Sequence, residues 1–171
     1  MTPPTLRRAV ESDFAAIWPI FQTVVATGAT YVFAADTPEK DAFAYWFGPG
    51  IRSWVAETDG QVVGMYKIVA NQRDRGAHVA NASFMVAPDA AGRGIGRAMG
   101  EDCLRQARVL GFRAMQFNFV VSTNQPAVDL WRSLGFAIAG TLPGAFHHDS
   151  LGYVDAYVMF RSLDDIEPAA D

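Results

Sequence analysis

The feature that most constrains the fold is a glycine-rich turn placed between a strand and a helix. Residues 86–98 read Val-Ala-Pro-Asp-Ala-Ala-Gly-Arg-Gly-Ile-Gly-Arg-Ala, with glycine at positions 92, 94 and 96. Because glycine has no Cβ, backbone N–H groups in such a turn can approach a ligand closely. The helix start adds unpaired donors and the positive end of the helix dipole, so the segment predicts a phosphate or pyrophosphate site. Arg93 and Arg97 would supply full positive charge beside it.

Several known glycine motifs do not fit this turn. The dinucleotide pattern G-x-G-x-x-G fails, because Arg97 or Met99 stands where its third glycine belongs. The Gly-Lys-Ser/Thr of a P-loop is absent. A strand-to-helix connection with no ligand could also carry these glycines, and it is the weaker interpretation. Three histidines and one cysteine lie scattered without metal-ligand spacing, so no metal site is predicted.

Hydrophobic periodicity predicts strands and helices on both sides of this turn. Strands are expected at 6–10, 53–57, 61–67, 78–87, 113–121, 136–141 and 153–160. Helices are expected with Ser12, Thr37, the glycine turn and Asn124 at their starts. Asp59-Gly60 predicts a hairpin. The residues between the last two strands, which include Gly144 and His147-His148-Asp149, are assigned to a loop. Hairpins mixed with strand–helix–strand units indicate an α/β fold with one mixed sheet and helices on its faces.

Two ordered motifs resemble those of the GCN5-related N-acetyltransferases, the GNAT family. The acetyl-CoA motif of that family, Gln/Arg-x-x-Gly-x-Gly/Ala, is matched from Ala91 through Gly96. A second signature is matched by residues 124–127, 130–131 and 134–136, and the resemblance extends from residue 6 to residue 159. It implies a mostly antiparallel sheet that splays after the strand 78–87, with acetyl-CoA lying in the gap.

The resemblance also implies which residues hold the cofactor. The pantetheine would pair with backbone near Met85, Val86 and Ala87. The pyrophosphate would sit on the amides of Gly92, Arg93, Gly94, Ile95, Gly96 and Arg97. A free amine would attack the thioester, and the N–H of Val86 would donate to the oxyanion that forms. Asn124 is expected to contact the pantetheine or thioester end, with a plain helix N-cap as the competing role.

The chain departs from the family pattern at two positions. Ala91 stands where Gln or Arg is usual, which removes a side-chain contact to the phosphates but none of the backbone donors. Trp131 stands where many members place the tyrosine that protonates the departing thiolate, and indole cannot serve as that acid. Because a thiol with a pKa near ~8.5 leaves readily as a thiolate, we predict activity without a tyrosine acid.

Polar residues inside apolar strands point to the acceptor site. Burying an unpaired amide costs roughly 1–3 kcal/mol, so Asn81 and Asn118 should face either a substrate or irregular backbone where the sheet splays. Tyr31 and Phe33 are expected to wall an acceptor pocket, with ordinary core packing as the alternative. His148 is a candidate general base, although a solvated surface pair of histidines is favoured.

These asparagines make the chain resemble the branch of phosphinothricin and azetidine-carboxylate acetyltransferases, which implies a small amino-acid-like amine as the acceptor. An α-amino group, with a pKa near ~7.7–8, also needs less base catalysis than a lysine. Two alternatives remain open: a protein or peptide N-acetyltransferase with an open groove, and a non-catalytic acyl-CoA binding module. The resemblance further implies a homodimer.

Composition bounds the remaining partners. The 171 residues are the length of one domain, expected over residues 1–171 with an ordered core near 5–163 and short flexible ends. With 14 basic and 18 acidic residues, the net charge of −4 disfavours nucleic acid. No apolar run approaches the ~20 residues of a membrane span. The single cysteine, Cys103, fits a reducing compartment, and a cytoplasmic location is expected.

Overall fold

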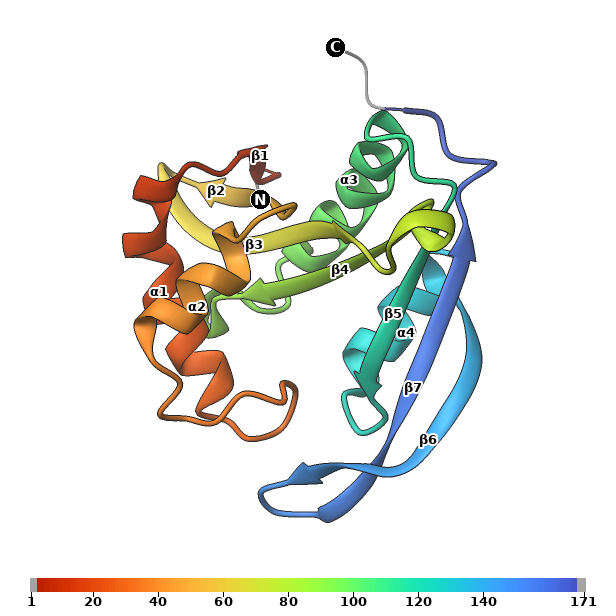
Figure 1. Cartoon of the computed structure of the whole chain (residues 1–171). Helices are drawn as coiled ribbons and strands as arrows, with labels where there is room; N and C mark the ends of the chain where they lie inside the picture. The colour runs from red at the N-terminus through yellow and green to blue at the C-terminus, as the bar shows by residue number, and fades with distance from the viewer. Residues whose placement is uncertain (1–2, 169–171) are drawn as a thin grey trace.

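The computed structural model describes residues 3–168 (Figure 1). Residues 1–2 and 169–171 of the expected flexible ends lie outside the described residues. The strands are β1 (Thr5–Arg8), β2 (Arg52–Thr58), β3 (Gln61–Ala70), β4 (Val79–Val86), β5 (Ala114–Val121), β6 (Ala137–His148) and β7 (Gly152–Ser162). The helices are α1 (Phe14–Val25), α2 (Glu39–Phe47), α3 (Ile95–Val109) and α4 (Gln125–Ser133).

The strands form one sheet in the order β1-β2-β3-β4-β5-β7-β6. Between described residues, β4 and β5 pair in parallel and every other neighbouring pair is antiparallel. The parallel pairing joins only Val79 to Ala114 and Ala80 to Met115, after which the two strands diverge (Figure 1). The predicted α/β class and the splay after the fourth strand are therefore confirmed.

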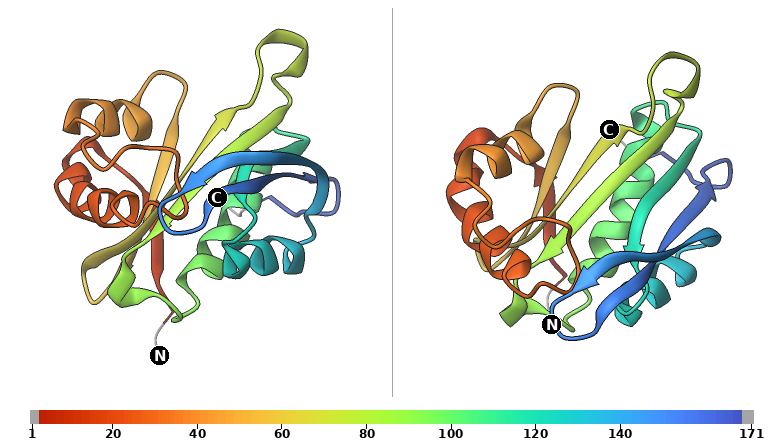
Figure 2. Two further views of the ribbon diagram at one scale, coloured as in Figure 1. Left: turned by 90° about the horizontal axis from the view of Figure 1, so that it is seen from below. Right: turned by 60° about the horizontal axis from the view of Figure 1, so that its bottom comes forward.

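Helices cover both faces of the sheet, as predicted (Figure 2). Helices α1 and α2 lie on one face, and α3 and α4 lie on the other. Within residues 3–168, no helix is both long and apolar enough to span a membrane. Helix α3 passes close to the end of α4 at Gly100, where a Cβ would lie 2.6 Å from Leu134 Cδ1 and 3.2 Å from Trp131 Cζ3.

Two predicted helix caps are wrong. Ser12 lies inside a 3₁₀ turn, and it is the Asp13 carboxylate that accepts the Val10 N–H at 2.8 Å before α1 begins. Thr37 donates its hydroxyl to the Ala34 carbonyl, which leaves Pro38 in the N-cap position of α2. In both places a side chain bonds backbone that precedes the helix, as short polar residues often do in turns.

The loop predicted around residues 144–149 is largely strand. β6 continues to His148, with shifts in its register against β7 between Ile138 and Gly140 and between Leu142 and Phe146. Such irregularities let an edge strand accommodate the proline and glycine that locally favour a loop. At the end of this hairpin, the Asp149 N–H donates to the Gly28 carbonyl at 3.2 Å, so the hairpin contacts the segment between α1 and α2.

Candidate functional site

The glycine turn ends in an uncapped helix. Gly92 and Gly94 have φ angles of +75° and +78°, a left-handed conformation that favours glycine. Gly94 is the N-cap of α3 and its carbonyl accepts the Ala98 N–H at 3.0 Å. Among the described residues, no side chain caps this helix, so the first N–H groups of α3 are available to an anion.

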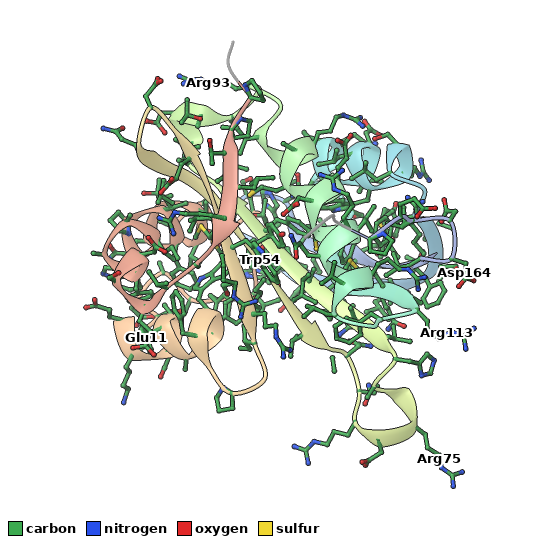
Figure 3. The ribbon with its side chains drawn as sticks, turned by 90° about the horizontal axis from the view of Figure 1, so that it is seen from above. Glu11, Trp54, Arg75, Arg93, Arg113 and Asp164 are labelled. Carbon is green, nitrogen blue, oxygen red and sulfur yellow. The ribbon has the colours of Figure 1, made fainter. Side chains whose placement is uncertain are left out.

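The two arginines of the turn differ in their surroundings. Arg97 donates to Ser133 Oγ at 2.8 Å and lies 3.7 Å from the Glu101 carboxylate, so its guanidinium links α3 to α4. Arg93 is exposed at the surface beside the turn (Figure 3). Ala91 is also exposed. Arg93 is therefore the arginine whose charge is free to move toward a bound phosphate.

Backbone direction along β4 follows from its pairing with β3. The Ala87 N–H donates to the Val63 carbonyl at 2.8 Å, so backbone groups of odd-numbered β4 residues face β3. Backbone groups of Phe84 and Val86 consequently face the opening toward β5. Of the three residues predicted to pair with pantetheine, Val86 directs its backbone into the opening, whereas Met85 and Ala87 direct theirs toward β3.

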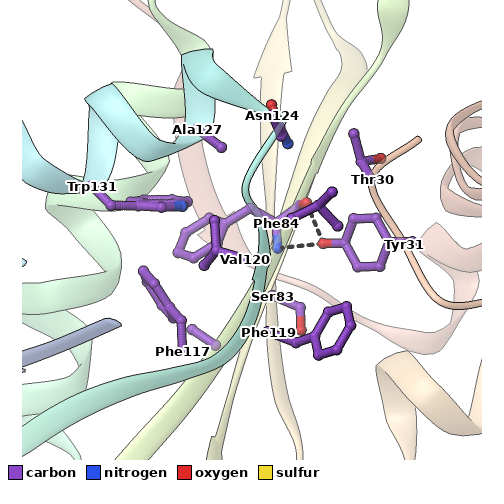
Figure 4. A pocket seen from close by; sticks show the side chains of 12 residues that line it. Thr30, Tyr31, Ser83, Phe84, Phe117, Phe119, Val120, Asn124, Ala127 and Trp131 are labelled. Carbon is purple, nitrogen blue, oxygen red and sulfur yellow. Dashed lines mark hydrogen bonds between the residues drawn. The ribbon is translucent and has the colours of Figure 1, made fainter. Parts of the chain in front are cut away.

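A first cavity of about 120 Å³ occupies the splay between β4 and β5. The rings and methyl groups of both strands and of α4 form most of its wall (Figure 4). It is lined by Thr30, Tyr31, Ala82, Ser83, Phe84, Phe117, Phe119, Val120, Val121, Asn124, Ala127 and Trp131. The cavity thus lies where the resemblance places the reacting end of the cofactor.

Asn124 and Trp131 reach this first cavity from α4. Asn124 is the N-cap residue of α4 by position, yet its side chain makes no capping hydrogen bond. Its amide instead lines the first cavity (Figure 4). Trp131 is buried against Phe84 and Phe117, with ring centroids 4.7 and 4.8 Å away. The Asn124 side chain therefore does not act as a helix cap, and Trp131 fills a place in the wall.

A second cavity of about 200 Å³ adjoins the first. It is lined by Thr30, Tyr31, Val32, Phe33, Tyr45, Asn81, Ala82, Ser83, Phe117, Asn118 and Phe119. The two cavities share Thr30, Tyr31, Ala82, Ser83, Phe117 and Phe119. The structure thus brings the four residues predicted for the acceptor, Tyr31, Phe33, Asn81 and Asn118, to one cavity.

Asn81 bridges the splayed strands, whereas Asn118 is exposed, contrary to the expected burial, and bonds side chains of β5 and of the segment after β3. Asn81 Nδ2 donates to the Gln116 carbonyl at 3.0 Å, across the point where β4 and β5 separate. Asn118 donates to Asn71 Oδ1 at 2.6 Å and accepts from Gln116 Nε2 at 2.8 Å. Asn81 therefore fills both expected roles, because it bonds backbone at the splay and also lines the second cavity.

Three polar residues of the second cavity and its wall are missed by sequence reasoning. The Tyr45 hydroxyl lies 2.6 Å from Ser83 Oγ, and Lys67 Nζ donates to the Tyr45 carbonyl at 2.7 Å. Lys67 is 5% exposed, and burial lowers its pKa to about 7. Burial also raises the pKa of Tyr31 and of Tyr45, which keeps both hydroxyls neutral. A lysine within an apolar strand is the signal that could have found this cluster.

His148, the candidate general base, lies outside both cavities. His148 lies in β6, where its Nδ1 accepts the Ser150 N–H at 3.2 Å, and it lines neither cavity. Neither wall, as formed by residues 3–168, includes a histidine or a carboxylate. In the same part of the chain, no three metal-ligating side chains gather into a cluster. An acceptor amine in these cavities would therefore have no histidine or carboxylate of residues 3–168 in the wall to take its proton.

Comparisons with known proteins agree on one family. A model of the acetyltransferase (GNAT) family matches residues 15–136. The chain is 36% identical to the N-acetyltransferase aca1 of Schizosaccharomyces pombe over 61% of its length and only 52% of that relative. It is 35% identical to the L-amino acid N-acetyltransferase AaaT of Escherichia coli over 66% of this chain and 69% of the relative. It is 30% identical to the phosphinothricin N-acetyltransferase of Alcaligenes faecalis over 93% of this chain and 82% of the relative.

Solved structures give the same picture. A GCN5-related N-acetyltransferase from Kribbella flavida superposes with a TM-score of 0.88 and 46% identity, covering 94% of this chain and 98% of that one. A phosphinothricin acetyltransferase from Sinorhizobium meliloti, solved in complex with acetyl-CoA, superposes with a TM-score of 0.84 and 25% identity, covering 98% and 94%. Both similarities extend over nearly the whole chain.

Proposed function

The chain belongs to the GNAT family of N-acetyltransferases, and from this premise we propose that it acetylates the amine of a small amino-acid-like acceptor. The observation that carries the proposal is the pair of adjoining cavities. The first cavity lies in the splay beside β4, the second is bordered by the segment between α1 and α2, and they share six lining residues. Two reactants held in these cavities would meet beside the six residues that line both cavities.

Support for acetyl-CoA comes from the glycine turn and the free edge of β4. The uncapped amides of α3 would bind the pyrophosphate, aided by the charge of Arg93. The Val86 backbone faces the opening and would pair with pantetheine or stabilise the oxyanion. Asn124 would bond the amide or thioester end from the rim of the first cavity. Acetyl-CoA supplies an activated acetyl thioester, and these residues hold it in place.

Support for a small acceptor comes from the size of the second cavity and the chemistry of its wall. At about 200 Å³ it lies below the range of roughly 300–1,000 Å³ that is usual for drug-sized ligands. Tyr31, Phe33 and Tyr45 close one side with packed rings, and Phe33 meets Tyr45 at a centroid distance of 4.8 Å. Two relatives named above are an L-amino acid and a phosphinothricin acetyltransferase, and both names denote small amino-acid-like acceptors.

A protein or peptide acceptor is the second candidate, and the hairpin contact counts against it. The Asp149 N–H bonds the Gly28 carbonyl, which ties the β6–β7 turn to the segment that carries Tyr31 and Phe33. A polypeptide would need that segment to be displaced to form an open groove. A non-catalytic acyl-CoA binding module is the third candidate, raised by Ala91 and Trp131.

The experiment is an assay of thiol release from acetyl-CoA against amino acids, amino-acid analogues, polyamines and short peptides. We expect release with one small α-amine or cyclic amine, and a loss of about tenfold or more in kcat/KM in Asn81→Ala and Asn118→Ala. Gln61→Ala, an exposed polar residue in the β2–β3 hairpin, serves as the control. Turnover with peptides alone would favour the second candidate, and acetyl-CoA binding without any turnover would favour the third.

A further inference from the structure

The hydroxyl of Tyr31 makes two hydrogen bonds to the backbone of a single β4 residue. It donates to the Phe84 carbonyl at 2.5 Å and accepts the Phe84 N–H at 3.1 Å (Figure 4). These two Phe84 groups face the opening between β4 and β5, where the parallel pairing has ended. The Tyr31 side chain therefore takes the place of a neighbouring strand at this point.

The position of this contact coincides with the junction of the two cavities. Tyr31 lines both of them, and Phe84 lines the first. Tyr31 itself comes from the segment between α1 and α2, 53 residues away in sequence. A group bound on the Phe84 backbone would thus be within reach of ligands in either cavity.

The Tyr31 hydroxyl makes one hydrogen bond as acceptor and one as donor, and each of the two reactants could replace one of these bonds. A thioester carbonyl can accept the Phe84 N–H, as the Tyr31 oxygen does, but it has no proton to give to the Phe84 carbonyl. An amine can donate to that carbonyl, as the Tyr31 proton does. The N–H and the C=O of one strand residue point to the same side, so they would hold thioester and amine next to each other.

We propose that the Tyr31 hydroxyl is a placeholder on the Phe84 backbone, which acetyl-CoA displaces so that the thioester carbonyl takes the N–H and the acceptor amine takes the C=O. Tyr31 is then a positioning residue that keeps both groups hydrogen-bonded in the free enzyme. This inference rests on the proposed function, since it needs a thioester in the first cavity. It assigns the reacting carbonyl to the Phe84 N–H and leaves the Val86 backbone to pair with pantetheine, because N–H groups two residues apart on a strand lie about 6.6 Å apart and cannot share one oxygen.

The test compares the affinities of acetyl-CoA and CoA, because CoA has the same nucleotide and pantetheine but no carbonyl at the sulfur. Tyr31→Phe removes the competing hydroxyl and keeps the ring. We expect the ratio Kd(CoA)/Kd(acetyl-CoA), measured by calorimetry, to rise about fivefold in Tyr31→Phe. Tyr45→Phe is the matched control, because it also removes a buried phenol hydroxyl, but one that bonds the Ser83 side chain. Its ratio should stay within about twofold of the wild-type value.

An unchanged or lower ratio in Tyr31→Phe, with acetyl-CoA still bound, would overturn the placeholder role and leave the proposed function standing. Failure of the wild-type protein to bind acetyl-CoA would overturn both. A crystal structure of the wild-type protein with acetyl-CoA gives a readout that needs no variant. We expect Tyr31 Oη to have left Phe84 N in that complex. A retained bond between these two atoms would overturn the proposal.

Discussion

Lys67 Nζ lies 3.1 Å from the centroid of the Tyr45 ring and donates to the backbone carbonyl of the same residue at 2.7 Å. Tyr45 lines the second cavity, so Lys67 packs against a residue of the cavity wall. Lys67 also pairs with Ser83 in the register of β3 and β4, and Ser83 Oγ meets the Tyr45 hydroxyl. A buried amine, a ring and a hydroxyl thus fix one side of the proposed acceptor site.

The first prediction concerns stability against pH at Lys67. Burial lowers its pKa to about 7 in the folded protein, whereas an unfolded lysine titrates near ~10.4. Between these values the unfolded chain binds the additional proton, so the free energy of unfolding should rise with pH above about 7. Lys67→Met should remove this rise. Urea unfolding at several pH values from about pH 6 to about pH 9 measures this change in the free energy of unfolding.

Lys40→Met is the control for this experiment, because Lys40 is the other lysine of the chain and is exposed. It should leave the pH dependence as in the wild type. A wild-type unfolding free energy that falls from about pH 7 to about pH 9, or a rise that persists in Lys67→Met, would show that the buried lysine does not titrate as described.

The second prediction concerns the leaving thiolate. Trp131 packs against Phe84 and Phe117 in the wall of the first cavity, and no proton donor is needed there if the thiolate leaves unaided. We expect Trp131→Tyr to change kcat by less than about tenfold. General acid catalysis typically contributes about 10²–10⁴-fold, so a gain of that size would refute the unaided departure. Trp131→Phe, which restores no acid, separates packing effects from proton transfer.

The third prediction concerns the glycine turn. Gly94 has a φ of +78°, and a Cβ added there would have open space around it. Gly94→Ala would therefore strain the backbone without creating a steric clash. Gly60 has a φ of +75° and equally open space, but it lies in the β2–β3 hairpin. Gly94→Ala and Gly60→Ala should each cost about 1–2 kcal/mol of stability. Only Gly94→Ala should weaken acetyl-CoA binding, by about tenfold, because only that strain distorts the anion-binding amides.

Calorimetric titration of both variants with acetyl-CoA checks this comparison. Equal affinities in the two variants would mean that the left-handed turn before α3 does not organise the cofactor site.

The fourth prediction concerns the contact between α3 and α4. A Cβ on Gly100 would lie 2.6 Å from Leu134 Cδ1 and 3.2 Å from Trp131 Cζ3, so Gly100→Ala should destabilise the fold by up to about 2 kcal/mol after the ~1 kcal/mol gain in helix propensity is subtracted. Leu134→Ala creates space at the same point. The double variant should therefore lose less stability than the sum of the two single losses, as a double-mutant cycle by urea unfolding would measure. Strict additivity would mean that the helices separate without strain.

Much of the fold is predictable because its signals are local. Asp59 and Gly60 have φ angles of +52° and +75°, the left-handed pair that a tight hairpin requires, and the sequence shows them as Asp-Gly between two strands. The splay follows from the family resemblance, which also underlies the proposal that the glycine turn holds acetyl-CoA. β6 is predicted too short, because Pro143 and Gly144 indicate a loop unless the strand is already paired with register shifts.

The candidate site is likewise predictable only where its signals are local. Asn81 and Asn118 stand out as amides within apolar strands, and Tyr31 and Phe33 as rings within a loop, so their types allow either a pocket or ordinary structural roles, and the family resemblance favours the pocket. The pairing of Tyr45 with Ser83 spans 38 residues, and that of Tyr31 with Phe84 spans 53. Such contacts depend on how α2 and the preceding segment pack on the sheet, which no local pattern encodes.

The most direct test of the proposed acetyl transfer is mass spectrometry of the products formed from acetyl-CoA and a mixture of free amino acids, amino-acid analogues and short peptides. We predict the mass of one added acetyl group on a single small amine, with free CoA formed in equal amount. Acetylated peptides with unmodified small amines, or bound acetyl-CoA with no acetylated product, would contradict it.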